Sequence, residues 1–133
     1  MIFVDSTVWI DYLRGRSMPQ TDKLETLFGT GQIIVGDLVI TEVLQGTLGE
    51  KDFADTLEQF RTLPVVRLGG VLACVEAARN YRLLKERGYT IRKTIDSLIA
   101  TRCIADNFEL LHNERDFIPF EKHLGLRCVS LDS

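Results

Sequence analysis

Short apolar runs separated by helical patterns constrain the fold of this chain more than any other feature. Five runs, each too short for a helix and bounded by polar residues, glycine or proline, predict buried strands. They are Ile2-Phe3-Val4, Ile33-Ile34-Val35, Val65-Val66, Leu110-Leu111 and Cys128-Val129. Strands that alternate with helices predict a parallel sheet with helices on both faces, which is a three-layer α/β/α architecture of the α/β class.

Apolar residues at intervals of three and four predict four main helices between the strands. The stripes are Trp9, Tyr12 and Leu13; Ile40, Val43, Leu44 and Leu48; Cys74, Ala77, Ala78, Tyr81 and Leu84; and Ile95, Leu98, Ile99 and Cys103. The chain has 133 residues, 45% of them hydrophobic, and shows no repeat or linker. We therefore expect a single domain over residues 1–133 with a core of its own.

The sequence contains no feature that directs the chain to a membrane. No apolar run approaches the ~20 residues that span a bilayer, and Asp5 interrupts the apolar start where a signal peptide would continue. The expected location is the cytoplasm. Cys74, Cys103 and Cys128 lie in apolar stretches without CxxC spacing, so we interpret them as reduced core residues.

The charges are unevenly distributed along the chain. The net charge is −3, which by itself argues against a nucleic-acid partner, because phosphate binding usually needs a basic surface. Between residues 79 and 102, however, seven basic residues stand against two acids, a local charge of +5 that leaves −8 for the remainder. We call these seven residues the basic strip: Arg79, Arg82, Lys85, Arg87, Arg92, Lys93 and Arg102. A solvated helix surface and a phosphate-binding surface explain the basic strip equally well.

Asp5 and Glu42 are the first two candidate site residues. In open parallel sheets, ligands bind at the carboxyl ends of the strands, near a switch in strand order, and Asp5 directly follows the first predicted strand. Asp5 could instead cap the next helix, although Ser6 and Thr7 are also available as caps. Glu42 lies in a strongly apolar helical segment, and Gly46, one turn later, would leave room beside the carboxylate. A helix glutamate taken alone is more often an exposed residue.

Asp96 is the acid that is hardest to explain as a surface residue. Ile99, Ala100 and Cys103 follow at i+3, i+4 and i+7, so Asp96 shares its helix face with a buried stripe. With Thr94 as the N-cap, Asp96 would lie in the first turn and gain ~0.3–1 kcal/mol from the helix dipole. The solvent side of the helix would offer the same gain, and ionised side chains are seldom buried without a partner. We therefore favour a functional role.

Asp116 is the fourth candidate, and a role as a helix N-cap explains it as well as a functional role does. It follows the fourth predicted strand through the segment His112-Asn113-Glu114-Arg115. Carboxylates that converge at one end of a sheet repel each other, which is tolerated when a cation neutralises them or some protons stay bound. Oxygen-only ligation favours Mg²⁺ or Mn²⁺. His112 and His123 have no metal-ligand spacing, and we interpret both as structural or surface residues.

Four segments, taken in order, resemble the PIN-domain proteins and, within them, the VapC toxins of bacterial toxin–antitoxin pairs. Residues 1–15 (MIFVDSTVWIDYLRG) are similar to the family's first strand and helix, and residues 41–46 (TEVLQG) to its glutamate helix. Residues 96–100 (DSLIA) match the helix of the third acid, and residues 112–117 (HNERDF) match the last acidic motif. The resemblance implies a five-stranded parallel sheet. It also implies a catalytic, metal-binding cluster of Asp5, Glu42, Asp96 and Asp116, with Ser6 and Asn113 orienting ligands or substrate.

By the same resemblance, the chain is expected to be an endoribonuclease that depends on Mg²⁺ or Mn²⁺. It would hydrolyse the phosphodiesters of structured RNA, transfer RNA in particular, and leave 5′-phosphate and 3′-hydroxyl ends. RNA is held by phosphate contacts and by stacking on aromatic rings. The basic strip, together with Tyr81, Tyr89 and Arg115, is therefore the expected path of the substrate.

The resemblance also implies two protein partners. A cognate antitoxin would lay a hydrophobic segment over the first helices and place a basic side chain among the acids. Trp9, Tyr12 and Leu13 have the spacing of such a groove, although a plain core stripe is the more frequent meaning of that spacing. A homodimer is expected from the family as well.

Two other classes of protein remain open. Phosphatases of the haloacid dehalogenase type and receiver domains also gather acids at the strand ends of doubly wound sheets. The phosphatases need a second Asp where Thr7 stands, and receivers need an acid after a middle strand, where residues 65–69 offer none. A non-catalytic PIN-fold interaction module would use the acids to bind a basic partner. Metal-dependent cleavage of RNA discriminates between these classes.

Overall fold

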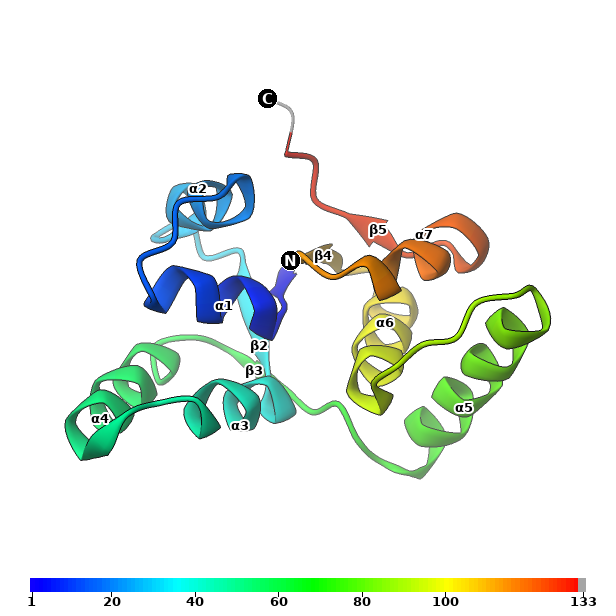
Figure 1. Ribbon diagram of the computed structural model, residues 1–133, viewed down its shortest axis with the longest axis horizontal. Coiled ribbons are helices and arrows are strands. Elements are labelled where there is room, and N and C mark those ends of the chain that lie inside the picture. Colours follow the sequence, from blue (N-terminus) through cyan, green and yellow to red (C-terminus); the bar gives the residue numbers. More distant parts are fainter. Residues whose placement is uncertain (132–133) are drawn as a thin grey trace.

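The computed structural model describes residues 1–131, in which strands and helices alternate along the chain (Figure 1). The strands are β1 (Ile2–Val4), β2 (Ile33–Gly36), β3 (Val65–Val66), β4 (Glu109–Leu111) and β5 (Arg127–Cys128). All neighbouring strands are parallel, in the order β3-β2-β1-β4-β5. The predicted five-stranded parallel sheet is confirmed, with β5 beginning one residue earlier than the sequence pattern indicated.

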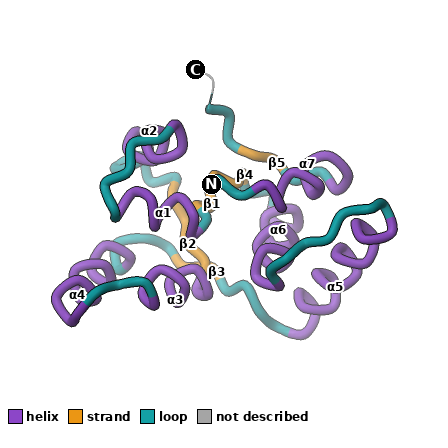
Figure 2. The backbone as a smooth tube through the Cα atoms, in the orientation of Figure 1, coloured by secondary structure: helices purple, strands orange, loops and turns teal. Residues whose placement is uncertain are grey.

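The helices form two layers around the sheet. They are α1 (Ser6–Leu13), α2 (Pro19–Leu27), α3 (Asp37–Gln45), α4 (Gly49–Phe60), α5 (Val71–Glu86), α6 (Thr94–Asp106) and α7 (Ile118–Leu124), with a 3₁₀ turn, η1, at Arg115–Phe117. Figure 2 shows α1 to α4 on one side of the strands and α5 to α7 on the other, as the α/β/α architecture requires. Within residues 1–131, every helix is too short or too polar to cross a membrane. The cytoplasmic location stays a prediction.

The central strands are buried because helices cover both faces of the sheet. Every residue of β1 and β2 is buried, in keeping with the continuous apolar runs that parallel strands require. Ile2 lies opposite Ile33 of β2 and Glu109 of β4. The pairing of β1 with β4 extends to Asp5, whose backbone N–H donates to the carbonyl of Leu111 at 3.0 Å. Asp5 is thereby fixed at the carboxyl end of the central strand.

The strand order reverses at β1. The chain passes from β1 to β2 and β3 on one side, crosses the sheet through α5 and α6, and adds β4 and β5 on the other side. In open α/β sheets the connections that leave in opposite directions at such a point open a crevice at the carboxyl ends of the strands. Asp5 follows β1 and residues 112–117 follow β4. Two of the acidic segments predicted from the sequence therefore meet at this crevice.

The junction between β2 and α3 is closely packed. A Cβ atom on Gly36 would lie 2.7 Å from Leu68 Cδ1 and 2.7 Å from Phe3 Cζ, so only glycine fits between these side chains. The carboxylate of Asp37 accepts hydrogen bonds from the backbone N–H groups of Leu38 (2.8 Å) and Leu68 (3.0 Å). These contacts fix the start of α3, the helix that carries Glu42.

Two helix ends differ from the predictions. α6 begins at Thr94 with Lys93 as its N-cap, so the prediction of Thr94 as N-cap was wrong by one residue, and Asp96 still lies in the first turn. α3 ends at Gln45, and Gly46 is its C-cap instead of an interior residue. A glycine at a helix end costs little, since the backbone there no longer needs helical propensity.

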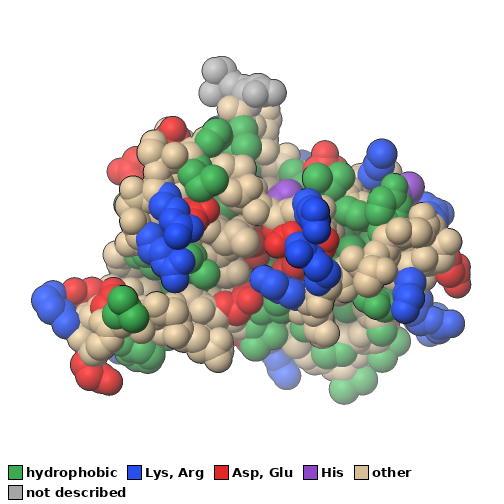
Figure 3. Space-filling view, in the orientation of Figure 1, with side chains coloured by type: hydrophobic (Ala, Val, Ile, Leu, Met, Phe, Trp, Pro, Cys, Tyr) green, Lys and Arg blue, Asp and Glu red, His purple; other side chains and the backbone are tan. Residues whose placement is uncertain are grey.

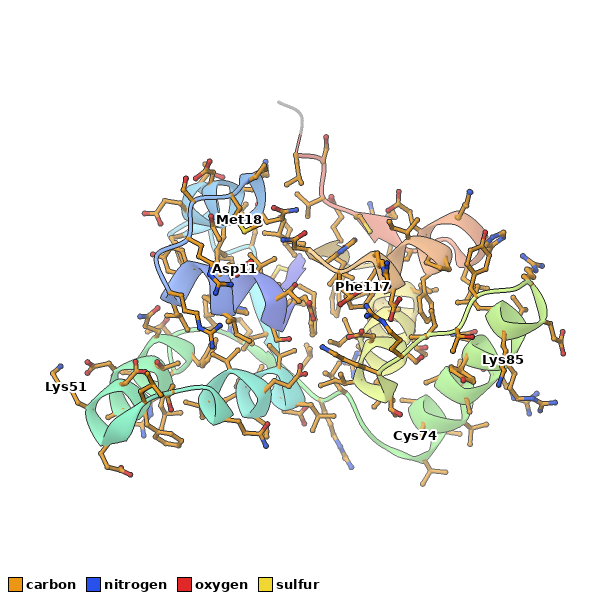
Figure 4. All side chains as sticks on the ribbon, in the orientation of Figure 1. Asp11, Met18, Lys51, Cys74, Lys85 and Phe117 are labelled. Carbon is orange, nitrogen blue, oxygen red and sulfur yellow. The ribbon has the colours of Figure 1, made fainter. Side chains whose placement is uncertain are left out.

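The prediction that all three cysteines belong to the core was wrong for Cys74. Cys103 is buried and Cys128 is half-buried, whereas Cys74 is exposed on α5 (Figure 4). Of the predicted stripe on this helix, only Ala77 and Leu84 are buried. The reason is that α5 packs on α6 and α7 but leaves the apolar side chains of its first turns uncovered by the described chain.

Candidate metal and catalytic site

Asp5 is both a helix cap and a buried carboxylate with a free oxygen. It is 1% exposed and is the N-cap of α1, where Oδ2 accepts hydrogen bonds from the Thr7 backbone N–H (3.2 Å) and hydroxyl (2.6 Å). Oδ1 is buried and has no hydrogen-bond partner among residues 1–131. Burial raises the pKa of Asp5, while the bonds from Thr7 lower it. One oxygen is thus anchored and the other is available to a ligand.

Asp96 lies in the first turn of α6 and is 4% exposed. Burial raises its pKa from 3.8 to about 7, and the negative charges of Asp5, Glu114 and Glu42 act in the same direction, while Lys93 opposes them. Its Oδ2 atom is buried and unpaired within the described chain. The effect of these charges on Asp96 indicates that acids from four separate segments lie near one another, although within the described residues no three of them bring one oxygen each within 4.8 Å of the others.

Glu42 reaches the same crevice from α3. It is half-buried, its Oε1 atom lacks a hydrogen-bond partner within residues 1–131, and its charge raises the pKa of both Asp5 and Asp96. The predicted role of Gly46 in leaving room for this carboxylate was wrong. A Cβ on Gly46 would meet the Val43 carbonyl at 3.6 Å and a guanidinium nitrogen of Arg14 at 4.0 Å. The space beside Gly46 therefore lies next to Arg14.

Asp116 is buried but is engaged by an arginine. Its Oδ2 atom accepts hydrogen bonds from the backbone N–H (3.1 Å) and from Nε (3.0 Å) of Arg92. A terminal nitrogen of the same guanidinium lies 2.8 Å from Glu114 Oε1, which also accepts from the backbone N–H of Asp116 at 3.2 Å. Asp116 and Glu114 therefore hold Arg92 together, and the charge of Glu114 also raises the pKa of Asp96.

The sequence analysis missed Glu114 as a site residue. It lies two positions before Asp116 in the same irregular segment, and no periodicity there indicates which acid points into the crevice. Both carboxylates bind Arg92, which stands more than twenty positions earlier in the chain, so their placement depends on a contact that the local sequence does not indicate.

Thr7 fixes the Asp5 carboxylate, while the orienting roles expected of Ser6 and Asn113 stay predictions. The Thr7 hydroxyl donates to Asp5 Oδ2 and accepts from the backbone N–H of Asn113 at 3.2 Å, so it links α1 to the segment after β4. The side-chain amide of Asn113 is directed at Met18 Sδ, 3.9 Å away. Ser6 is buried, and its backbone N–H lowers the pKa of Asp5.

The donor set fits a hard divalent cation. Asp5 Oδ1, Glu42 Oε1 and Asp96 Oδ2 are buried, negatively charged when ionised, and unpaired in the described part of the chain. Buried unpaired carboxylates are costly unless a cation neutralises them. Oxygen-only donors of this kind suit Mg²⁺ and Mn²⁺, which retain water in their remaining positions.

Basic side chains border the acids. Figure 3 shows acidic side chains in the middle of one face, with Lys and Arg side chains beside them. Within the basic strip, Arg92 binds two acids, and Arg102 binds Asp106 and the carbonyl of Arg67. Arg79, Arg82 and Lys85 are exposed on α5. The basic strip is therefore part structural and part solvent-facing.

The fold and the site define an α/β domain with buried acids at the switch point of its sheet. The family model of the PIN domain matches residues 2–122, and the chain belongs to this family. It is 24% identical to the VapC ribonuclease Mb1587 of Mycobacterium bovis over 132 residues, which cover 98% of both chains. It has the same identity and coverage with ribonuclease VapC11 of Mycobacterium tuberculosis.

Solved structures share the fold. VapBC2 of Rickettsia felis, bound to a promoter DNA fragment, superposes with a TM-score of 0.72 at 21% identity, over 97% of this chain and 98% of the other. VapBC-1 of nontypeable Haemophilus influenzae gives a TM-score of 0.67 at 16% identity, with complete coverage of both chains. The predicted PIN fold is confirmed by these similarities.

Proposed function

We propose that this chain is the toxin of a toxin–antitoxin pair and acts as an endoribonuclease that depends on Mg²⁺ or Mn²⁺. The observation that carries this proposal is the set of three buried, unpaired carboxylate oxygens on Asp5, Glu42 and Asp96, at the switch point of a PIN-family sheet. Relatives named as VapC ribonucleases match the chain over nearly its whole length, which supports the reaction and the toxin role.

Asp5, Glu42 and Asp96 would hold the cation, with Glu114 close by. When bound, the cation would polarise the phosphodiester and lower the pKa of a bound water. Thr7 keeps the Asp5 carboxylate in one orientation. Asp116 completes the predicted cluster by fixing Arg92, whose guanidinium lies at the edge of the acids, where the charge of a phosphate can be met.

The substrate proposed is structured RNA, and transfer RNA in particular follows from the family resemblance. Arg79, Arg82 and Lys85 project from α5 into solvent, and Arg115 is exposed beside the acidic segment. Exposed guanidinium and ammonium groups bind phosphates, and Tyr81 and Tyr89 are half-buried rings that would stack on bases with the faces left open by Lys85 and His123. These residues would guide the RNA backbone towards the acids.

The cognate antitoxin would bind at the groove between α1 and α4. A cavity of about 580 Å³ is lined by Trp9, Tyr12 and Phe28, with Asp55 and Glu58 at its rim. The Phe28 ring lies 5.3 Å from that of Tyr12 and 6.2 Å from that of Trp9. Trp9 is 1% exposed, so the stripe of Trp9, Tyr12 and Leu13 also packs in the core, which is the more frequent meaning of its spacing. An apolar segment with basic flanks fits this groove.

A homodimer would bury the uncovered end of α5. Val71 and Leu72 are 79% and 88% exposed, and Val75 and Cys74 lie beside them. Exposed apolar groups of this kind mark interaction surfaces. Sedimentation velocity of the wild type and of Leu72→Lys tests this surface as the dimer interface. In a symmetric dimer both subunits carry the substitution, so two like charges enter the interface and weaken it. A variant that sediments as the wild type does would reject this surface.

Cleavage of RNA by the purified protein tests the proposed function. We expect cleavage with Mg²⁺ or Mn²⁺, none with a chelator, and none by Asp96→Asn, whose fold is checked by circular dichroism. Asp106→Asn is the matched control, since Asp106 lies on the same helix but is exposed and paired with Arg102. Undiminished cleavage by Asp96→Asn in the presence of chelator would refute the mechanism.

A further inference from the structure

A second group of metal-ligating side chains lies behind the acidic segment. His112 follows β4, Glu121 lies on α7, and Cys128 ends β5. One ligand atom from each lies within 4.8 Å of the other two. These residues also line a surface cavity of about 680 Å³. The sequence analysis interpreted His112 as a structural or surface residue, because its partners come from two other elements.

We propose that His112, Glu121 and Cys128 form a binding site for a thiophilic divalent ion such as Zn²⁺, separate from the acidic site. A thiolate, an imidazole and a carboxylate together are the donors that Zn²⁺ accepts, whereas the acidic site offers oxygen alone. Three protein ligands leave the fourth tetrahedral position to water, which the cavity admits.

The separations are close to those of a bound ion. Zinc bonds of about 2.0–2.3 Å at tetrahedral angles place ligand atoms roughly 3.3–3.6 Å apart. The three atoms, now within 4.8 Å of one another, need to approach by at most about 1.5 Å. Glu121 is exposed and Cys128 half-buried, so rotation of these two side chains can supply the movement while the backbone of β4 and β5 stays paired.

The thiol is protonated in the absence of an ion. Burial and the neighbouring Glu121 carboxylate raise the pKa of Cys128 to about 12. A divalent cation would attract both the Cys128 thiolate and the Glu121 carboxylate, and it would thereby lower the pKa of the thiol. Uptake of the ion therefore releases one proton from Cys128.

His112 couples this site to the acids of the crevice. Its Nδ1 atom accepts a hydrogen bond from the backbone N–H of Glu114 at 3.1 Å, and its ring packs against Phe117 with centroids 4.9 Å apart. A neutral imidazole has one nitrogen lone pair. Whichever ring nitrogen binds the ion, that lone pair is used, and the Glu114 N–H loses its acceptor. The Glu114 carboxylate holds Arg92 and its charge acts on Asp96, so the ion would disturb the catalytic segment.

Titration of the full chain with Co²⁺, a spectroscopic substitute for Zn²⁺, tests the binding without any activity measurement. We expect a near-ultraviolet thiolate-to-cobalt absorption band that Zn²⁺ displaces. The band should be lost in Cys128→Ser and kept in Cys74→Ser, because Cys74 lies on α5, outside the cluster (Figure 4). Cys128→Ser should also weaken Zn²⁺ binding by more than about tenfold. A band that is absent, or that persists in Cys128→Ser, would overturn the proposal.

The same titration of Asp96→Asn separates this site from the proposed function. We expect an unchanged thiolate band in this variant, since Asp96 is outside the trio. The amide resonance of Glu114 should shift on adding Zn²⁺ to the wild type and stay in place in Cys128→Ser. A resonance that moves equally in both proteins would refute the coupling. Zn²⁺ inhibition of RNA cleavage that disappears in Cys128→Ser is the expected consequence, and it rests on the proposed function.

Discussion

Asp96 should destabilise the folded chain measurably when the acidic site holds no cation. The side chain is 4% exposed, and its pKa rises from 3.8 to about 7 on folding. At about 1.4 kcal/mol for each pKa unit, this shift corresponds to a destabilisation of up to about 4 kcal/mol. Because the folded-state pKa is the higher one, this destabilisation is absent below pH 3.8, grows as the pH rises towards 7, and is complete above it.

Urea denaturation in the presence of a chelator measures this quantity without RNA. Asp96→Asn cannot ionise, so at pH 8 it should exceed the wild type in unfolding free energy by up to about 4 kcal/mol. At pH 5 the difference should shrink to less than half of that value. The control Asp106→Asn should follow the pH dependence of the wild type, since exposed ion pairs contribute about 1 kcal/mol or less.

Addition of Mg²⁺ completes the experiment. At pH 8 the cation should stabilise the wild type strongly and Asp96→Asn weakly, because the variant lacks one of the charged oxygens that bind it. Parallel pH curves for the wild type and Asp96→Asn would refute the argument that burial and neighbouring acids penalise this charge. Equal stabilisation of both proteins by Mg²⁺ would place the cation elsewhere.

Three further changes test the packing, the positioning and the substrate path. Gly36→Ala should lower the free energy of unfolding by about 1–3 kcal/mol in urea denaturation, while Gly69→Ala, which meets no atom within 4 Å, should change it by less than about 0.5 kcal/mol. Thr7→Val removes the hydroxyl hydrogen bond that lowers the pKa of Asp5, so the pH of half-maximal RNA cleavage should rise. Thr7→Ser keeps the hydroxyl and should keep the wild-type pH profile. The same profile in both variants would refute the positioning role of Thr7. Arg82→Gln should reduce the slope of log affinity for RNA against log salt by about 0.7–1, and an unchanged slope would remove Arg82 from the path.

The elements of this fold could be predicted because their signals are local. A run such as Ile2-Phe3-Val4 is apolar at every position, which only a strand buried on both faces explains. Asp96 could be predicted in the same way, since its neighbours at i+3 and i+4 belong to the buried face of one helix. Both arguments use residues within a few positions of one another.

The arrangement of the last acidic segment could not be predicted, because it depends on partners far away in the sequence. Arg92 binds both Glu114 and Asp116, and this pairing positions the segment in which the charge of Glu114 raises the pKa of Asp96. The same holds for His112, whose potential metal partners come from α7 and β5. Local spacing carries no information on either set of contacts.

The exposure of the apolar stripe on α5 could not be predicted for a different reason. An apolar stripe shows that a helix has a face that avoids water, and it does not show whether the covering surface belongs to the same chain. Cys74 and its neighbours have the pattern of core residues yet are exposed. The stripe indicates an apolar face, and its interpretation as core was wrong because the described chain leaves this face exposed.

The central position of β1 has a consequence for synthesis on the ribosome. A growing chain that has emerged as far as β3 contains Asp5 and Glu42 but neither Asp96 nor Glu114. Asp5 can be hydrogen-bonded to β4 only after residue 111 has been made, because the backbone N–H of Asp5 donates to the carbonyl of Leu111. Chains are extended at about 5–20 residues per second, so every nascent copy spends seconds without a complete acidic site. Under the proposed function, the order of these acids along the chain would keep the ribonuclease from cutting RNA until β4 and the segment after it have been made.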